Sequence, residues 1–384
     1  MSSQLLRLEG VIRGYDWGSR GGISRALGDD ATDAVEAELW LGAHPSAPAR
    51  IIPASVGPSD LAEWERQTGQ SIPFLLKLLS ARSPLSLQAH PTTEQAAAGY
   101  AAEEAAGITR SARERNYKDP FAKPELIVAL EDGFEALCGF REAAETLATV
   151  RHLAEVSPDP APIREWEHIL RGNDAVRSAF SWLLGGGRAI DRLLTTLTLA
   201  AAADPLRFEL PNRIAHQYPG DVGIAICLML NHVVLAAGEA LWLPAGNIHA
   251  YLSGTGMELM GPSDNVLRGG MTSKHVDLPE LLRVLDFSTG PSSKLVPERR
   301  SDHAVEYRPA SVPTGQNVRF ALVKVDGDVV VPTEGPAVGL VTRGEFFVSA
   351  GAVAGTFIRG SAFIVAGTKA IDVQGEGDLY LAVS

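Results

Sequence analysis

The sequence predicts a mainly β protein, with two jelly-roll barrels and a helical domain inserted into the first. Three observations support this fold class. The first 140 residues mix short strand-like segments with a few helices. Apolar positions then recur at helical spacing from about residue 142 to residue 202. After residue 318 the chain consists of short Val-, Phe- and Gly-rich segments with regular turns, which indicate a second antiparallel barrel.

Four elements can be predicted in the first part of the chain. The segment 74–79 is an apolar run interrupted only by Lys77, which suits a largely buried strand. The segment 96–106 is rich in Ala and Glu, so it should form a helix just after the turn at His90 and Pro91. The other two predictions are a surface helix at 61–70 and a strand at 126–130.

The helical pattern of apolar residues begins at about residue 142, and Pro and Gly separate the predicted helices. The predicted helices of this domain are 142–155, 163–171, 174–184 and 188–202. A helix at 224–230, strands at 233–235 and 239–243, and a short helix at 280–285 follow. We therefore predict four segments: 1–140 and 217–285 form one barrel, 141–216 is the helical insertion, and 286–384 is the second barrel.

Composition excludes several classes of function. A net charge of −12 argues against a nucleic-acid surface, which needs clustered Lys and Arg. The apolar run 223–238 is broken by Asn231 and His232 and is too short to span a bilayer. Cys138 and Cys227 lie in apolar surroundings, which favours buried thiols in a reducing compartment over a disulfide. We expect a cytoplasmic monomer that contacts neither membrane nor nucleic acid.

Four separated side chains have the chemistry of a metal site. Gln88 and His90 are two residues apart, so on a strand both would leave the same face. Glu125 and His249 are far away in sequence and must arrive on other strands. Imidazole and carboxylate are common zinc ligands, and the set contains no cysteine, which argues against a purely structural zinc site.

The segment that ends at His249 has a spacing of its own. Gly238 is followed after five residues by Pro244, then by Gly246 and His249. This spacing resembles the second metal motif of the cupin family of β-barrels. Residues 239–243 alternate as a strand does, and Pro244 and Gly246 force a turn that brings His249 back into the barrel.

A narrower resemblance covers the chain from about Tyr15 to Lys274. Six motifs, in the family's order, resemble those of the type I mannose-6-phosphate isomerases. They are Tyr15-Asp16-Trp17-Gly18, Ala37-Glu38-Leu39-Trp40-Leu41-Gly42, Asn116-Tyr117-Lys118-Asp119-Pro120, Lys123-Pro124-Glu125, His249-Ala250-Tyr251-Leu252 with Glu258, and Ser263-Asp264-Asn265-Val266-Leu267-Arg268. After about Asp277 the resemblance is loose.

The resemblance implies one Zn²⁺ per chain, bound by Gln88, His90, Glu125 and His249. It also implies an aldose–ketose isomerase that interconverts mannose 6-phosphate and fructose 6-phosphate by proton transfer through an ene-diol. A single metal site favours proton transfer over a hydride shift. Substrate is then a phosphorylated hexose.

Other residues take roles by the same resemblance. Arg268 would stabilise the ene-diolate as a fixed cation. The alternative is a structural role for Arg268, in an ion pair with Asp264. Glu258, Lys123 and Asp264 are the candidate acid–base residues, and none is preferred. The expected substrate contacts are Ser86, Lys274 and Tyr251. We expect the site in the mouth of the first barrel, partly roofed by the helical insertion.

The chain departs from the family pattern at three places near the expected site. One is Asn247-Ile248, which replaces a more usual acidic residue and proline. Phe121-Ala122 stands where Asn-His is usual, so an imidazole is missing. Thr92-Thr93 replaces an acidic residue and a lysine, and Arg82 or Arg113 could supply the lost cation. These changes keep three alternatives open: an isomerase for a related sugar, a silent sugar-phosphate sensor, and a cupin that uses iron or manganese for oxygen chemistry.

Overall fold

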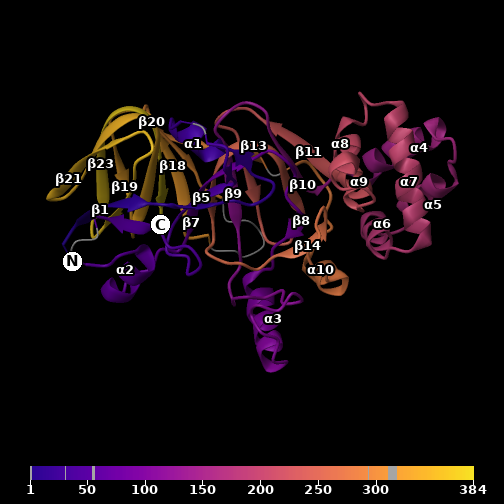
Figure 1. Ribbon diagram of the computed structural model, residues 1–384, viewed down its shortest axis with the longest axis horizontal. Helices are drawn as coiled ribbons and strands as arrows, with labels where there is room; N and C mark the ends of the chain where they lie inside the picture. Colours follow the sequence, from indigo (N-terminus) through magenta and orange to yellow (C-terminus); the bar gives the residue numbers. More distant parts are fainter. Residues whose placement is uncertain (1, 31, 54–56, 293, 310–317) are drawn as a thin grey trace.

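The computed structural model describes residues 2–30, 32–53, 57–292, 294–309 and 318–384. The chain forms three parts along its long axis (Figure 1). A C-terminal sheet lies at one end together with both termini, further strands fill the middle, and most helices gather at the other end. Helix α3 projects from the central part (Figure 1).

The helical elements lie mostly in the region where the sequence predicts them. They are α1 (Gly22–Leu27), α2 (Leu61–Thr68), α3 (Thr93–Ala105), α4 (Ala143–Val156), α5 (Ala161–Leu170), α6 (Ala175–Leu184), α7 (Arg188–Ala203), α8 (Glu209–Gln217), α9 (Gly223–Ile226), the 3-10 turn η1 (Cys227–Met229) and α10 (Leu278–Val284). Helix α8 was not predicted. The predicted helix 224–230 is shorter, because the chain already enters a strand at Leu230.

The central part is one extended antiparallel sheet that curls on itself. Within the described residues its main path runs β15-β12-β9-β13-β7-β5-β2, and β8, β10, β11 and β14 attach through β13 and β10. These strands are β2 (Val11–Arg13), β5 (Glu38–Leu41), β7 (Leu75–Ala81), β8 (Leu87–Ala89), β9 (Glu125–Ala129), β10 (Phe134–Phe140), β11 (Leu230–Leu235), β12 (Ala240–Leu243), β13 (His249–Met260), β14 (Leu267–Gly270) and β15 (Lys294–Leu295). A two-stranded ribbon pairs β3 (Ser19–Arg20) with β4 (Val35–Glu36).

Strand β13 closes this sheet. Its first half pairs with β10 and β8, whereas its second half pairs with β7 and β9. The change of partner falls at Gly254, whose φ is 113°. A Cβ there would lie 2.8 Å from the Cα of Phe134, so both the backbone angle and the close approach require glycine.

The outer faces of the central strands are apolar and pack on two sides. Leu126 and Val128 of β9 belong to a core shared with the C-terminal sheet. Leu87 and Ala89 of β8, with Ile248, belong to a core shared with the helices α4 to α9. Since side chains alternate along a strand, the residues between them point into the barrel.

The second sheet confirms the expected β-rich C-terminal part and adds two strands from the N-terminus. Within the described residues its path runs β16-β17-β18-β23-β20-β22-β1-β6, with β19 on β23 and β21 on β20. Its strands are β1 (Gln4–Glu9), β6 (Arg50–Ile52), β16 (Glu298–Ser301), β17 (Ala304–Tyr307), β18 (Ala321–Val325), β19 (Val329–Pro332), β20 (Ala337–Ala350), β21 (Val353–Ile358), β22 (Ala362–Ala366) and β23 (Ala370–Val383).

The mainly β fold class with a helical insertion is therefore confirmed, but residues 1–140 do not all belong to the first barrel. Strand β1 pairs with β22 and β6 pairs with β1. Leu8 of β1 packs in the core between the two sheets, which favours this long-range pairing. With that correction, the division at 141–216, 217–285 and 286–384 remains a prediction. None of the described helices is both long and apolar enough to cross a membrane.

A polar contact ties the helical insertion to the barrel. Glu135 of β10 accepts hydrogen bonds from Arg213 of α8 and lies 3.3 Å from the Nε2 of His232 on β11. The hydrogen bond with His232 and the charge of Arg213 lower the pKa of Glu135 to about 2, although burial opposes them. The carboxylate is thus stabilised in the folded state.

Glu135→Gln should destabilise the protein at neutral pH and much less in acid. The folded-state pKa lies below the usual value, so the contribution is complete above about pH 5 and is lost as the pH falls toward 2. Because this ion pair is partly exposed and screened by solvent, we expect a loss of only about 1–2 kcal/mol at pH 7 in urea denaturation. A difference that does not shrink between pH 7 and pH 3 would contradict this account, and Glu165→Gln, an exposed position on α5, serves as the control.

Candidate metal centre

The four predicted ligands meet inside the barrel. Glu125 begins β9, His249 begins β13, Gln88 is the middle residue of β8, and His90 follows that strand directly. The Nε2 atoms of His90 and His249 lie 3.3 and 3.2 Å from the two carboxylate oxygens of Glu125. The side-chain amide of Gln88 lies 3.4 Å from the Nε2 of His249. Strand β8 is shorter than predicted, so Ser86 and His90 flank it.

Both imidazoles direct Nε2 toward the carboxylate. The Nδ1 of His90 lies 2.8 Å from the carbonyl oxygen of Asn265, and the Nδ1 of His249 lies 3.0 Å from that of Asn247. A carbonyl oxygen only accepts, so each Nδ1 carries a proton, and in a neutral ring the lone pair is then on Nε2. Burial lowers the pKa of His90 to about 4, so this ring is neutral at pH 7.

The geometry fits a bound cation. His90, Glu125 and His249 are almost fully buried, and one ligand atom from each lies within 4.8 Å of the others. The Nε2 of His90 and one oxygen of Glu125 have no hydrogen-bond partner. A nitrogen lone pair and a carboxylate oxygen that face each other in a buried space repel unless a cation lies between them. Among the described residues, this is the one group with metal-binding geometry.

Buried charges surround the centre. Lys123 lies 2.8 Å from Glu125. Burial raises the pKa of Glu125, but the charge of Lys123 outweighs it and lowers that pKa well below its usual range. On the neighbouring strands Lys77 lies between two carboxylates, 3.5 Å from Glu38 and 3.2 Å from Glu258. The sequence analysis missed the role of Lys77, although a lysine within an apolar strand was the available signal.

Glu258 and Tyr251 lie behind the wall of the cleft. Tyr251 donates a hydrogen bond of 3.0 Å to Glu258, and both side chains are buried. Burial raises the pKa of Glu258, and the nearby Lys77 opposes this effect. Neither residue lines the cleft beside the metal centre. A direct substrate contact by Tyr251 is therefore not supported, because β13 turns this ring into the core with Phe134.

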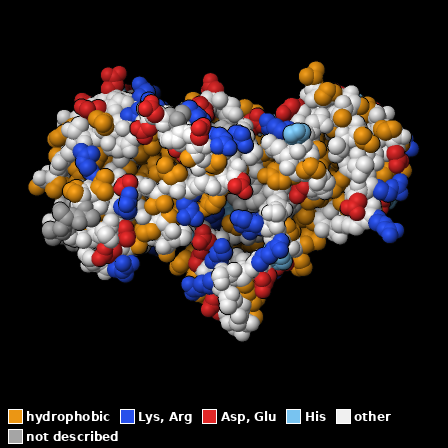
Figure 2. All heavy atoms as spheres, viewed as in Figure 1, with side chains coloured by type: hydrophobic (Ala, Val, Ile, Leu, Met, Phe, Trp, Pro, Cys, Tyr) orange, Lys and Arg blue, Asp and Glu red, His pale blue; other side chains and the backbone are white. Residues whose placement is uncertain are grey.

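A cleft of about 470 Å³ opens beside the metal centre. Gln88 and Lys123 line it, and so do the stacked rings of Tyr15 and Trp17, whose centroids are 5.7 Å apart. Figure 2 shows several Lys and Arg side chains gathered in the middle of this face, above the projecting α3. No described residue of 141–216 lines the cleft, so the helical insertion does not roof it as we expected.

Besides Lys77 and Lys123, three further cations and a hydroxyl group of interest line the cleft. They are Lys118, Arg268, Lys274 and Ser86. Arg268 of β14 pairs with Gln88 across the two strands. Within the described part of the chain its guanidinium makes no side-chain hydrogen bond or ion pair, so the alternative of an Asp264 partner is wrong. Burial and the neighbouring charges of Arg268 and Lys118 lower the pKa of Lys274, which indicates that these cations lie close together.

Asp264 has a different partner. The Nε2 of His44 lies 3.4 Å from its carboxylate, and both residues line the cleft. This hydrogen bond and the charge of His44 lower the pKa of Asp264, while burial opposes them. His44 was not singled out by the sequence analysis, because no motif marked a lone imidazole in that loop.

The departures from the family pattern fall mostly outside the cleft. Phe121 is 58% exposed and does not line it, and Thr92 caps the N-terminus of α3. Arg82, offered as a replacement cation, lines a different cavity. Arg113 donates a hydrogen bond to the carbonyl of Ser273 at the edge of the cleft. Lys118, which the sequence analysis did not single out for this role, supplies a cation instead.

Comparison with known proteins agrees with this geometry. Residues 5–143 match the family model for the catalytic domain of type I phosphomannose isomerase. The chain is 34% identical to the mannose-6-phosphate isomerase of Escherichia coli K12, over 97% of this chain and 98% of that protein. The chain belongs to the type I phosphomannose isomerase family. Rat mannose-6-phosphate isomerase is 32% identical over 73% of both chains.

Solved structures of phosphomannose isomerases have the same fold over nearly the whole chain. The apo form from Salmonella typhimurium superposes with a TM-score of 0.86 at 29% identity, and 99% of each chain is covered. A mannose 6-phosphate isomerase described as holo and zinc-bound gives a TM-score of 0.86 at 30% identity, with the same coverage. The likeness therefore extends through the helical insertion and the second sheet, beyond the segment that the family model matches.

His249→Ala should abolish stoichiometric zinc binding without unfolding the C-terminal sheet. The substitution removes one of three converging donors, and the C-terminal sheet has a hydrophobic core of its own. Zinc content after dialysis would be measured by atomic absorption. His303→Ala, an exposed imidazole on the C-terminal sheet, is the matched control and should keep its zinc. Full zinc occupancy in His249→Ala would exclude this centre.

Proposed function

We propose that the chain is a zinc-dependent isomerase that interconverts mannose 6-phosphate and fructose 6-phosphate. One observation carries the proposal. The buried His90, Glu125 and His249 converge directly behind a cleft that cations line, and the Nε2 of His90 and one oxygen of Glu125 have no hydrogen-bond partner. This combination suits a sugar phosphate, because one end of the substrate is anionic and the other must change its pattern of hydroxyl and carbonyl groups.

Zinc would be held by Gln88, His90, Glu125 and His249. When bound it supplies a Lewis acid that polarises an oxygen of the sugar. The protein prepares the ligands for this ion. The carbonyl groups of Asn265 and Asn247 fix the two imidazole tautomers, and Lys123 holds Glu125 in its anionic form.

The phosphate end is proposed to bind near Ser86, Lys118 and Lys274. A phosphate would make hydrogen bonds to a hydroxyl group and to two ammonium groups there. Such a local positive region is needed because the chain as a whole carries a charge of −12. The stacked Tyr15 and Trp17 offer an apolar surface to the face of the sugar.

The proton is proposed to move between adjacent carbons of the open-chain sugar through an ene-diol. Its acceptor must reach the substrate, so we take it to be the carboxylate of Asp264, which lines the cleft. Lys123, whose ammonium group pairs with Glu125, can only donate a proton. Glu258 lies behind the wall of the cleft, where it forms an ion pair with Lys77 and helps to fix the arrangement of the buried charges. Arg268 projects beside Gln88 and is placed to stabilise the ene-diolate oxygen.

A coupled assay with zinc supplied tests the function. Mannose 6-phosphate should be converted to fructose 6-phosphate, and the product detected by a coupling enzyme. Binding of the sugar phosphate with no turnover would favour the alternative of a silent sensor. Oxygen consumption with iron or manganese bound would favour the oxygen-dependent alternative instead. A cytoplasmic location and a monomeric state remain predictions from the sequence.

Arg268→Ala should lower kcat by about 100-fold or more with a much smaller change in KM. The reason is that the negative oxygen that it stabilises develops only in the transition state. Steady-state kinetics would measure both constants. Lys274→Ala removes a cation from the same cleft and is the matched control, because it should mainly raise KM. An effect of Arg268→Ala confined to KM would contradict the assigned role.

A further inference from the structure

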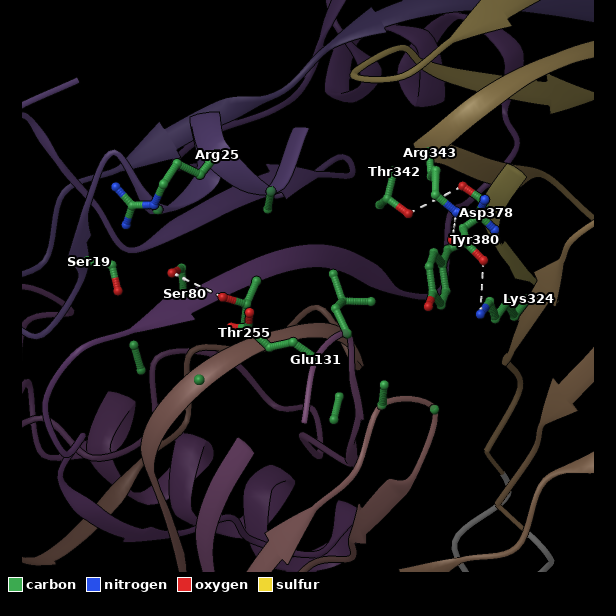
Figure 3. Close-up of a pocket in the computed structure, with 18 of the residues that line it drawn as sticks. Ser19, Arg25, Ser80, Glu131, Thr255, Lys324, Thr342, Arg343, Asp378 and Tyr380 are labelled. Carbon is green, nitrogen blue, oxygen red and sulfur yellow. Dashed lines mark hydrogen bonds and ion pairs between the residues drawn. The ribbon is translucent and has the colours of Figure 1, made fainter. Parts of the chain in front are cut away.

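A second, larger cavity lies where the two sheets meet, away from the metal centre. Its volume is about 780 Å³. One wall comes from α1, from the ends of β7 and β9 and from the middle of β13, and the other comes from β18, β20 and β23 of the C-terminal sheet. Figure 3 shows Ser19 and Arg25 on one side, Lys324, Asp378 and Tyr380 on the other, and Ser80, Thr255 and Glu131 between them. The volume is within the range of small-molecule sites.

The lining carries an excess of positive charge. Its cations are Arg25, Arg82, Lys324, Arg343 and Arg359, and its carboxylates are Glu131 and Asp378. Asp378 is already neutralised, since Arg343 lies 2.6 Å and Lys324 lies 2.9 Å from its oxygens. Only Glu131 remains to offset the other three cations. In a chain with a net charge of −12, this local excess is not a general property of the surface.

The three remaining arginines have no carboxylate partner among the described residues. Arg25 donates a hydrogen bond to the carbonyl of Arg20, and Arg359 donates to the carbonyls of Arg25 and Ala26. Carbonyl groups orient a guanidinium but do not neutralise it. Arg82 is exposed and makes no side-chain hydrogen bond or ion pair in the described part of the chain. These groups can therefore still bind an anion.

Hydroxyl groups line the space between the charged walls. Ser80 is buried, and its Oγ lies 3.4 Å from the Oγ1 of Thr255. Tyr380 is only 3% exposed, and no described residue accepts or donates a hydrogen bond at its hydroxyl. Figure 3 shows this ring directed into the cavity. The hydroxyl is available to a molecule in the cavity, which favours a ligand with hydroxyl groups.

We propose that this cavity is a second binding site, which takes a phosphate monoester of a small polyol. The phosphate binds to Arg25, Arg82 and Arg359, and the hydroxyl groups of the ligand bind to Ser80, Thr255 and Tyr380. The site is separate from the isomerase cleft, because Arg82 and Tyr380 do not line that cleft. A ligand there contacts both sheets, so it should also raise the melting temperature.

The test uses the zinc-loaded full chain and D-glucitol 6-phosphate in isothermal titration calorimetry. This probe has no carbonyl group, so the measurement does not depend on turnover. Wild-type protein should bind two equivalents. Arg82→Glu should weaken one of them by tenfold or more and leave the other, while Lys274→Ala should weaken the other one. Tyr380→Phe removes a single oxygen atom, keeps the ring in the core, and should weaken the same equivalent as Arg82→Glu.

Arg164→Glu is the matched control, because it makes the same change of charge at an exposed position on α5. It should keep both equivalents. Only one equivalent in the wild type, or equal weakening by Arg82→Glu and Arg164→Glu, would overturn the proposal. Should Arg82→Glu fail to fold, Arg82→Gln and Tyr380→Phe decide the matter. Failure of the coupled isomerase assay would leave this result unaffected, so the two proposals can fail separately.

Discussion

The burial of charge inside the central barrel is the constraint on which the other features depend. Glu38, Glu125 and Glu258 are all nearly inaccessible to water, and an unpaired buried carboxylate is costly. Lys77 and Lys123 offset two of the three. His90 does not offset the remaining negative charge, because its neutral ring directs a lone pair toward Glu125, which already pairs with Lys123. A divalent cation beside Glu125 would change the net charge of this cluster from negative to positive. The same ion would therefore stabilise the interior of the barrel and supply the Lewis acid for the reaction.

Such a cluster is stable only when water is kept out, and the rest of the chain provides this exclusion. The same strands that turn Lys77 and Glu125 inward turn Leu76, Leu78 and Leu126 outward into the core shared with the C-terminal sheet. On the opposite side the helices α4 to α9 cover Leu87 and other outward residues of the barrel. Neither the helical insertion nor the second sheet needs to line the metal cleft, because their contribution is to cover the outer faces of its strands.

Local patterns in the sequence were sufficient to predict much of this arrangement. The alternation around Gln88 predicted its inward direction, and the turn at Pro244 and Gly246 predicted the return of His249 to the barrel. Pairing between distant strands was not predictable in the same way. Nothing near β1 shows that its partner is β22, because that choice depends on a core formed by residues hundreds of positions away. The helical insertion was expected over the cleft for the same reason, since spacing along the chain does not fix where a domain docks.

The departure from the family motif at Phe121-Ala122 affects the site less than the motif alone suggests. The backbone carbonyl of Phe121 accepts hydrogen bonds from Asn265 and Ser263, while its ring faces solvent. Asn265 also accepts a hydrogen bond from the backbone of Lys118, and its own carbonyl orients His90. One buried amide thus connects this loop, a cation of the cleft and a metal ligand. The geometry of this loop depends on the backbone of Phe121, so the change from Asn-His to Phe121-Ala122 leaves the metal centre and its supports in place.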